Sequence, residues 1–285
     1  MIPKIVLEET VRRALMEDLQ GGDLTTEATV AEDARAVAHA RAKSDLVVCG
    51  ADVFASVFLT LDPGLRVVHF HEDGARVPAG TELFRVEGST RSILLGERTA
   101  LNFVQRMSGI ATQARQYVDA LPPGCPTRIT DTRKTTPGLR ALERYAVRCG
   151  GAHNHRDALG AGILIKDNHI EAAGGVVAAL ECARRRAPHT VRLEIEVDSV
   201  AALELALRAR ADIVMLDNFA PDDLASALGM CRGKALVEVS GGITLERIGE
   251  LGRLGVDVVS VGALTHSVPA ADIALSIERI GPDPA

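Results

Sequence analysis

The sequence predicts an α/β protein with two parts, an N-terminal α+β open sandwich domain and a C-terminal α/β barrel that is TIM-like and either complete or incomplete. From residue 125 onward, short apolar runs alternate with amphipathic helical patterns, as parallel strands joined by helical crossovers do. Before residue 112, short β-type runs are separated by glycine and proline turns. Polar residues follow nearly every later strand, which favours a barrel over a doubly wound sheet.

The N-terminal part, expected to cover residues 1–112, begins with an amphipathic helix and a Gly21-Gly22-Asp23 turn. The predicted helices are 5–18, 51–61 and a long stretch over 92–120, and the predicted strands are 36–42, 46–49, 65–71 and 82–87. We expect the long helix to break near Ser108 and Gly109 and to link the two parts. Strands interrupted by a helix and by turns predict an α+β layer.

The barrel is expected to cover residues 113–269, and the tail 270–285 is expected to pack back on the N-terminal domain. The predicted strands are 128–132, 162–166, 191–197, 212–216, 235–239 and 257–261. The predicted helices are 139–149, 176–186, 200–209, 222–231 and 245–254.

Composition narrows the class of protein. The chain has 285 residues, 3% aromatic residues and a net charge of −6, which argues against nucleic acid or an anionic membrane as partner. Its five cysteines include no C-x-x-C pair, so a zinc site or a disulfide framework is not expected. Without a signal-peptide pattern or an apolar run of ~18 residues, the sequence predicts a cytoplasmic protein.

Basic residues gather after the first two barrel strands. Arg133 and Lys134 follow the first strand, His155 and Arg156 come next in the chain, and Lys166 ends the second strand. Arginine provides a planar fork for carboxylate or phosphate, and lysine a mobile point charge. Because these groups converge on one barrel mouth, the sequence predicts a pocket for a small molecule with several negative charges.

Acidic residues alternate along the third barrel strand. Arg192, Glu194 and Glu196 share one face, and the apolar residues between them must face the helices, so the acids point inward. Asp217 closes the next strand in the same way. Glu194 is interpreted as part of a structural ion pair, whereas Glu196 and Asp217 are candidates for contacts with a ribose or with Mg²⁺, which prefers oxygen ligands.

Glycines follow the last two strands and predict a phosphate site there, since exposed backbone N–H groups at this position bind phosphate in barrels. The candidate residues are Ser240, Gly241, Gly242, Val261, Gly262, Ala263 and His266.

These motifs resemble those of the quinolinate phosphoribosyltransferase family, and the resemblance runs nearly end to end. It covers residues 22–26, 96–102, 105–112, 131–140, 145–148, 154–156, 164–169, 215–218, 240–243 and 264–267. In the segment 156–162, Ala158 and Ala161 stand where relatives often carry Gly and Asp, which concerns details of the loop between the motifs.

The resemblance implies transfer of phosphoribosyl from phosphoribosyl pyrophosphate to quinolinate with decarboxylation, as in de novo NAD biosynthesis, with Mg²⁺ as cofactor. It also implies a homodimer in which the N-terminal domain of one subunit covers the barrel mouth of the other. The quinolinate ligands it implies are Arg133, Lys134, His155, Arg156 and Lys166, with Arg106 from the partner subunit. It assigns Glu196 and Asp217 to ribose and Mg²⁺, and the glycine turns to the 5′-phosphate.

Two alternatives stay open. One is a phosphoribosyltransferase with another substrate, such as nicotinate or the substrate of the relative associated with molybdenum transport. The other is a non-catalytic barrel that senses an anion. Nicotinate has one carboxylate and does not require so many cations, and CO₂ release from quinolinate separates these cases.

Overall fold

The structure is a computed structural model that describes residues 1–281, without the side chains of residues 221 and 222. Contacts divide the chain into two units, the first made of residues 1–115, 135–151 and 263 onward, and the second of residues 116–134 and 152–262. Neither unit is one continuous stretch of chain. The domain ranges expected from the sequence, 1–112 and 113–269, stay a prediction, from which this division differs at 113–115, 135–151 and 263–269.

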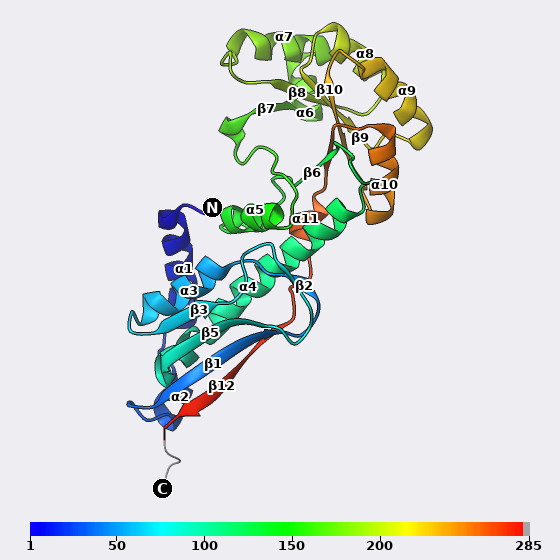
Figure 1. Cartoon of the computed structure of the whole chain (residues 1–285). Helices are drawn as coiled ribbons and strands as arrows, with labels where there is room; N and C mark the ends of the chain where they lie inside the picture. Colours follow the sequence, from blue (N-terminus) through cyan, green and yellow to red (C-terminus); the bar gives the residue numbers. More distant parts are fainter. Residues whose placement is uncertain (282–285) are drawn as a thin grey trace. The chain divides into compact units, whose positions relative to one another are not determined.

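The first unit contains an antiparallel four-stranded sheet in the order β12-β1-β5-β3 (Figure 1). Its strands are β1 (Arg35–Ala42), β3 (Arg66–His69), β5 (Glu82–Ser89) and β12 (Ile273–Ile280), and a small pair is formed by β2 (Leu46–Val47) and β4 (Arg76–Val77). Every second residue of β1 is buried, as expected for a strand with one covered face. Ring contacts among Phe54, Phe58 and Phe84 fill the core beside this sheet.

The helices of the first unit are α1 (Lys4–Asp18), α2 (Leu24–Thr29), α3 (Ala51–Leu61), α5 (Arg140–Cys149), α11 (Ala263–His266) and most of α4 (Thr90–Asp119). Helix α2, one of the shorter helices, was not predicted from the sequence. It begins where Asp23 accepts the Thr26 backbone N–H, the usual N-cap arrangement.

The long helix α4 runs without a break, so the break predicted at Ser108 and Gly109 is wrong. Gly109 serves close packing instead. A Cβ at this position would lie 2.3 Å from the Pro269 carbonyl oxygen, because the segment before β12 passes directly over the helix. The Gln105 carbonyl accepts the Ala271 N–H at 2.9 Å and the Gln105 side chain donates to Ile273, which fixes this segment on α4.

The second unit is built on a six-stranded parallel sheet in the order β6-β11-β10-β9-β8-β7, which confirms the predicted α/β class. Its strands are β6 (Arg128–Thr130), β7 (Ile163–Ile165), β8 (Leu193–Val197), β9 (Ile213–Asp217), β10 (Leu236–Ser240) and β11 (Val258–Ser260). The crossovers contain η1 (Leu159–Ala161), α6 (Asp167–Ala173), α7 (Val176–Arg186), α8 (Val200–Arg208), α9 (Pro221–Cys231) and α10 (Leu245–Leu254). Of these, η1 and α6 were not predicted.

The barrel wall is open on one side. Among the described strands, β6 pairs only with β11 and β7 only with β8, so no ladder joins the two edges. A single parallel bridge between Thr130 and His153 extends the wall beyond β6. The segment that carries His155 and Arg156 therefore lies directly beside β6.

Within residues 1–281, no helix combines the length and the apolar character that a membrane span requires.

Candidate functional site

The candidate active site is formed by residues at the carboxyl ends of the parallel strands. Lys166 follows β7, Glu196 lies near the end of β8, and Asp217 and Ser240 end β9 and β10, where they pair in register. Parallel strands bring their carboxyl ends to one edge of a sheet, so these residues share one end of the second unit. Arg133 and Lys134 follow β6 at the same end.

Asp131, directly after β6, positions the segment 153–156. Its buried carboxylate accepts the Asn154 side-chain amide at 2.6 Å through Oδ2 and the His155 backbone N–H at 2.8 Å through Oδ1. The His153 N–H also donates to the backbone of β6. Hydrogen bonds to an ionised acceptor are stronger than neutral ones, so Asp131 holds this segment in place.

Two arginines of the predicted anion pocket lie near one another. Burial and the charge of Arg133 lower the pKa of Arg156, whose Nη1 donates to the Gly162 carbonyl at 2.8 Å. The Nε of Arg133 is buried and has no hydrogen-bond partner within the described part of the chain. An anion bound here would relieve the repulsion between like charges and satisfy the buried donor. This pair is therefore suited to bind a carboxylate or a phosphate.

Lys134 extends the basic surface toward solvent. Its side chain is exposed, and its backbone N–H donates to the Thr132 hydroxyl at 3.1 Å. The loop thus presents a half-buried guanidinium and an exposed ammonium.

Lys166 and Glu196 form an ion pair between Nζ and Oε2. They come from neighbouring strands, since β7 pairs with β8. The Lys166 side chain is 45% exposed and that of Glu196 18%, so solvent reaches the pair. The His169 Nδ1 accepts the Lys166 backbone N–H at 3.0 Å and holds the start of α6 against the strand end. A cation and an acid are thus available side by side.

His155 points into the barrel and contacts two acids. Its Nε2 lies 3.4 Å from Glu194 Oε2 and 3.5 Å from Glu238 Oε2, and both carboxylates are almost fully buried. Glu194 is thus part of a structural ion-pair cluster, in agreement with the ion pair expected from the sequence. Burial alone would lower the pKa of His155, but the two carboxylates outweigh it and raise this pKa to about 10. Burial and the neighbouring Glu238 raise the pKa of Glu194, against the effect of His155.

This triad binds one proton more than its separate groups would at neutral pH. The backbone N–H of Arg156 donates to His155 Nδ1 at 2.8 Å, so that nitrogen carries no proton of its own. The ring proton is therefore on Nε2, which faces the two carboxylates. Coupled groups of this kind titrate as a unit, so the raised pKa belongs to the triad.

Four side-chain oxygens of the second unit are buried without a hydrogen-bond partner among the described residues. These are the Oε1 atoms of Glu194 and Glu238 and the hydroxyls of Thr130 and Ser260. They come from β8, β10, β6 and β11. Buried polar groups are nearly always satisfied by protein or ordered water, so these oxygens are available to accept hydrogen bonds.

Two groups of side chains could contribute to a metal site in this unit. Glu196 and Asp217 offer carboxylate oxygens at neighbouring strand ends, which suits Mg²⁺ in donor type. Lys166 already pairs with Glu196, and Asp217 Oδ2 accepts the Asn218 amide at 2.8 Å. His155, Glu194 and Glu238 form the second group, with ligand atoms within 4.8 Å of one another.

The turn after β10 requires glycine. Gly241 has φ +87°, and a Cβ there would lie 2.2 Å from the Asn218 Oδ1 and 2.9 Å from the Asn218 N. The Asn218 backbone N–H donates to the Ser240 carbonyl, which links the ends of β9 and β10. Gly242 also has a positive φ, and nothing lies near its Cβ position. Backbone is therefore exposed at this turn, as a phosphate site needs.

The remaining predicted phosphate ligands belong to different units. Val261 and Gly262 follow β11 in the second unit, and the Val261 N–H donates to the Thr130 carbonyl at 2.9 Å. Ala263 and His266 lie in α11 of the first unit, where His266 Nδ1 is 2.6 Å from the Ser267 hydroxyl. Within one unit, the candidate phosphate turn consists of residues 240–242, 261 and 262.

Arg106 is held within its own chain. Its guanidinium donates to the buried Glu143 at 2.8 Å and to the backbone carbonyls of Thr265 and Val268. The carboxylate of Glu143 is 1% exposed, and the arginine compensates its charge. Arg106 also lines a cavity of about 1010 Å³ beside α1 and α4. The expectation that Arg106 reaches into a partner's site stays a prediction.

Comparisons with known proteins give the family. Residues 110–276 match the family described as "Quinolinate phosphoribosyl transferase, C-terminal domain", and residues 23–108 match the family of the corresponding N-terminal domain. The nicotinate-nucleotide pyrophosphorylase [carboxylating] of Mycobacterium leprae is 44% identical over 94% of this chain and 96% of its own. The chain belongs to the quinolinate phosphoribosyltransferase family.

A second relative and a solved structure agree with this assignment. The probable nicotinate-nucleotide pyrophosphorylase [carboxylating] of Bacillus subtilis is 40% identical over 95% of this chain and 93% of its own. The nicotinate-nucleotide pyrophosphorylase from Francisella tularensis superposes with a TM-score of 0.92 at 39% identity, covering 98% of each chain.

Three residues that contribute to the site were not identified as site residues from the sequence. Glu238 stands between two valines in the strand candidate 235–239, and the alternation that identified Glu194 would also have identified it. Asp131 was recognised only as part of a motif. Asn218 has φ +55°, and no local signal in the sequence predicts its contact with Gly241.

Proposed function

We propose that this chain transfers phosphoribosyl from phosphoribosyl pyrophosphate to quinolinate and releases one carboxylate as CO₂, giving nicotinate mononucleotide and pyrophosphate for NAD biosynthesis. The family assignment supports this reaction. The observation that carries the substrate assignment is the arginine pair. Arg133 has a buried Nε with no hydrogen-bond partner among the described residues, and Arg156 has a lowered pKa. A dicarboxylate neutralises two neighbouring cations better than a monocarboxylate does.

The proposed quinolinate ligands are Arg133, Lys134, Arg156 and Lys166, with His155 at the inner wall. The ring nitrogen attacks the anomeric carbon of the ribose, and the bond from that carbon to pyrophosphate breaks. Positive charge develops on the ribose in this step, and the carboxylates of Glu196 and Asp217 stabilise it. Bound Mg²⁺ would neutralise charge on the leaving pyrophosphate.

Decarboxylation follows from the charge on the new pyridinium. The bond between the ring and the carboxylate breaks, its electron pair stays on the ring carbon next to the positive nitrogen, and CO₂ leaves. A proton then binds to that carbon. Lys166 and Lys134 are the proposed donors, and Lys166 is already ion-paired with Glu196.

The test is an assay of the purified full chain with carboxyl-labelled quinolinate, phosphoribosyl pyrophosphate and Mg²⁺. We expect equal amounts of CO₂ and nicotinate mononucleotide. Mononucleotide formed from nicotinate without CO₂ would identify the alternative transferase. Binding of quinolinate without turnover would identify a sensor.

Variants of the arginine pair test the substrate assignment. Arg133→Ala should raise the KM for quinolinate by roughly tenfold to a hundredfold, since losing a charge-assisted hydrogen bond costs about 1.5–3 kcal/mol. The matched control is Arg185→Ala, an exposed arginine in the last turn of α7, which should leave KM unchanged. Equal effects of the two substitutions would contradict the proposed pocket.

Magnesium dependence tests the two acids. Removal of Mg²⁺ with a chelator should abolish turnover, and its return should restore it. Asp217→Asn should raise the Mg²⁺ concentration needed for half-maximal rate. An unchanged metal requirement in this variant would remove Asp217 from the proposed metal site.

We also propose a homodimer, for which the family resemblance is the support. Light scattering of the purified chain measures the assembly directly. Mixing Arg106→Ala with Lys166→Ala subunits tests the shared site. If Arg106 acts across the interface, the mixture should recover some activity, and no recovery after verified subunit exchange would count against a shared site.

A cytoplasmic location completes the proposal. It is supported by the five cysteines, which are all free thiols in the structure. Cell fractionation with an antibody to the chain checks it, and recovery from an organelle or from a secreted fraction would contradict it.

A further inference from the structure

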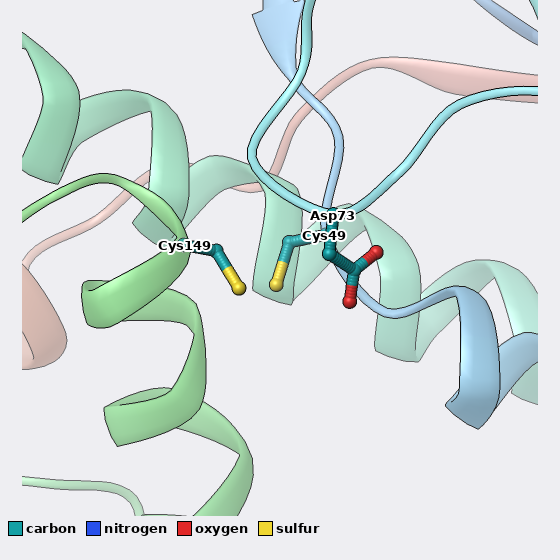
Figure 2. A group of neighbouring side chains, drawn as sticks. All are labelled: Cys49, Asp73 and Cys149. Atoms are coloured by element: carbon teal, nitrogen blue, oxygen red, sulfur yellow. The ribbon is translucent and has the colours of Figure 1, made fainter. Parts of the chain in front are cut away.

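Two cysteines outside the candidate active site face each other in the first unit. Cys49 lies between β2 and α3, and Cys149 ends α5. Figure 2 shows their sulfur atoms pointing toward one another, with Asp73 next to Cys49. The two sulfurs and a carboxylate oxygen of Asp73 lie within 4.8 Å of one another. Both thiols are free in this structure.

The backbones that carry the two cysteines are held against the same helix. The Cys49 N–H donates to the Ser108 hydroxyl of α4 at 3.1 Å, and this hydroxyl donates back to the Cys49 carbonyl. Behind Cys149, a Cβ on Gly150 would lie 2.5 Å from the Ala111 carbonyl of α4. Both sulfurs are thus positioned by close packing on α4, so their approach does not depend on a flexible loop.

The surroundings make the two thiols unequal. Cys49 is fully buried, and burial together with its hydrogen bond to Cys149 raises the pKa of its thiol. Cys149 is partly exposed. The hydrogen bond from Cys49 lowers the pKa of Cys149, and Tyr145 and Arg148 act in the same direction against burial and Asp73. A partly exposed thiol of lowered pKa beside a buried thiol is the arrangement of an attacking and a resolving cysteine.

Asp73 has other partners. Its Oδ1 accepts the backbone N–H groups of Gly50 and Ala51 at 3.0 and 3.1 Å at the start of α3. Its Oδ2 accepts the Tyr145 hydroxyl at 2.9 Å. The carboxylate therefore already serves as a cap and a hydrogen-bond acceptor, which favours a dithiol over a metal site built on the same three residues.

We propose that Cys49 and Cys149 form a redox-active dithiol that closes to a disulfide when a hydroperoxide is the oxidant. The Cys149 thiolate attacks one oxygen of hydrogen peroxide, the O–O bond breaks, and Cys149 becomes a sulfenic acid as hydroxide leaves. The Cys49 sulfur then attacks the Cys149 sulfur, the S–O bond breaks, and the departing hydroxide takes the Cys49 proton. Two thiols lose two electrons and two protons, and peroxide is reduced to two waters.

The disulfide would join the end of α5 to the segment before α3, two positions far apart in the chain. A cross-link that closes a long loop restricts the unfolded chain, so oxidation should raise the Tm of the protein. This consequence is independent of the proposed transferase activity.

The test oxidises the reduced full chain with hydrogen peroxide and maps its peptides without reduction. We expect a peptide pair joined through Cys49 and Cys149 and a rise in Tm, and both should be lost in Cys149→Ser. In Cys49→Ser, the sulfenic acid on Cys149 should persist and be captured by dimedone. Cys182→Ser, at a partly exposed cysteine of α7, is the matched control and should keep the joined pair.

Three outcomes would overturn the proposal. Oxidation spread over Cys125 and Cys182 without a joined pair would show that the two sulfurs do not react together. Loss of the joined pair in the Cys182→Ser control would also contradict a direct reaction between Cys49 and Cys149. Zinc bound to the purified chain and lost in Cys149→Ser would identify a metal site instead. Circular dichroism of each variant shows that loss of the pair does not come from unfolding.

Discussion

The cluster around His155 contributes to the pH dependence of stability. Its pKa is raised from 6.5 to about 10, so the proton bound to its cluster stabilises the fold fully below about pH 6.5. This contribution is lost as the pH rises through about 10. We expect the free energy of unfolding in urea to fall between pH 7 and pH 10. Glu238→Gln removes one carboxylate of the cluster and should flatten this dependence.

A contrary result would be a free energy of unfolding with the same pH dependence in both proteins. Nitrogen NMR of the His155 ring adds a second check, because the Arg156 N–H on Nδ1 requires the ring proton on Nε2. A ring proton on Nδ1 at pH 7 would mean that this hydrogen bond is absent in solution.

Gly241 is the residue whose substitution should most directly damage the phosphate turn. Gly241→Ala places a Cβ 2.2 Å from the Asn218 side chain at φ +87°, which L side chains rarely adopt. We expect the KM for phosphoribosyl pyrophosphate to rise at least about tenfold, equivalent to about 1.4 kcal/mol. Gly229→Ala in α9, where a Cβ meets open space, is the control. Steady-state kinetics of both variants measure this KM, and equal KM values would contradict the proposed phosphate turn.

At the level of elements, α4 shows how packing overrides a local signal. Gly in a helix interior costs about 1 kcal/mol relative to Ala, so the sequence predicts a break at Gly109. The helix nevertheless continues through Gly109. The glycine is needed there because the segment after Pro269 occupies the space that a Cβ would fill. The strands of the second unit were located with small errors at their ends, since apolar runs identify a buried strand but not the last residue that pairs.

Substituting the same glycine tests this explanation. Gly109→Ala should destabilise the chain by about 1–3 kcal/mol, because overpacking exceeds the gain in helix propensity. Gly249→Ala in α10 is the matched control, with its nearest contact at 3.4 Å, and should be neutral or stabilise by up to about 1 kcal/mol. The measurement is chemical unfolding of both variants. A more stable Gly109→Ala protein would contradict the packing argument.

At the scale of the whole molecule, the chain returns to its first unit after completing the second. β12 pairs with all of β1, from Arg35 with Ile280 to Ala42 with Ile273. Strands 35–42 and 82–89 alone would leave β1 as an edge with unpaired backbone groups. The stability of the N-terminal sheet therefore depends on the C-terminal segment.

Removal of residues 273–285 tests this dependence. We expect amide protection to fall in β1 and β5, while β8, β9 and β10 keep theirs, because the two units have separate sheets. Hydrogen exchange followed by mass spectrometry measures both in one experiment. Equal loss of protection in both units would show that they unfold together, and unchanged protection in β1 would show that β12 is dispensable.

The sequence by itself determined the alternation of strands and helices, the charged strand ends and the family motifs, because periodicity and strand-end position are local properties of the chain. Only the tertiary structure decided which charges meet. Arg133 lies near Arg156, His155 between Glu194 and Glu238, Arg106 against Glu143, and Cys49 opposite Cys149. These partners lie on different elements, and burial changes their charge states, so no pattern within one segment can predict them.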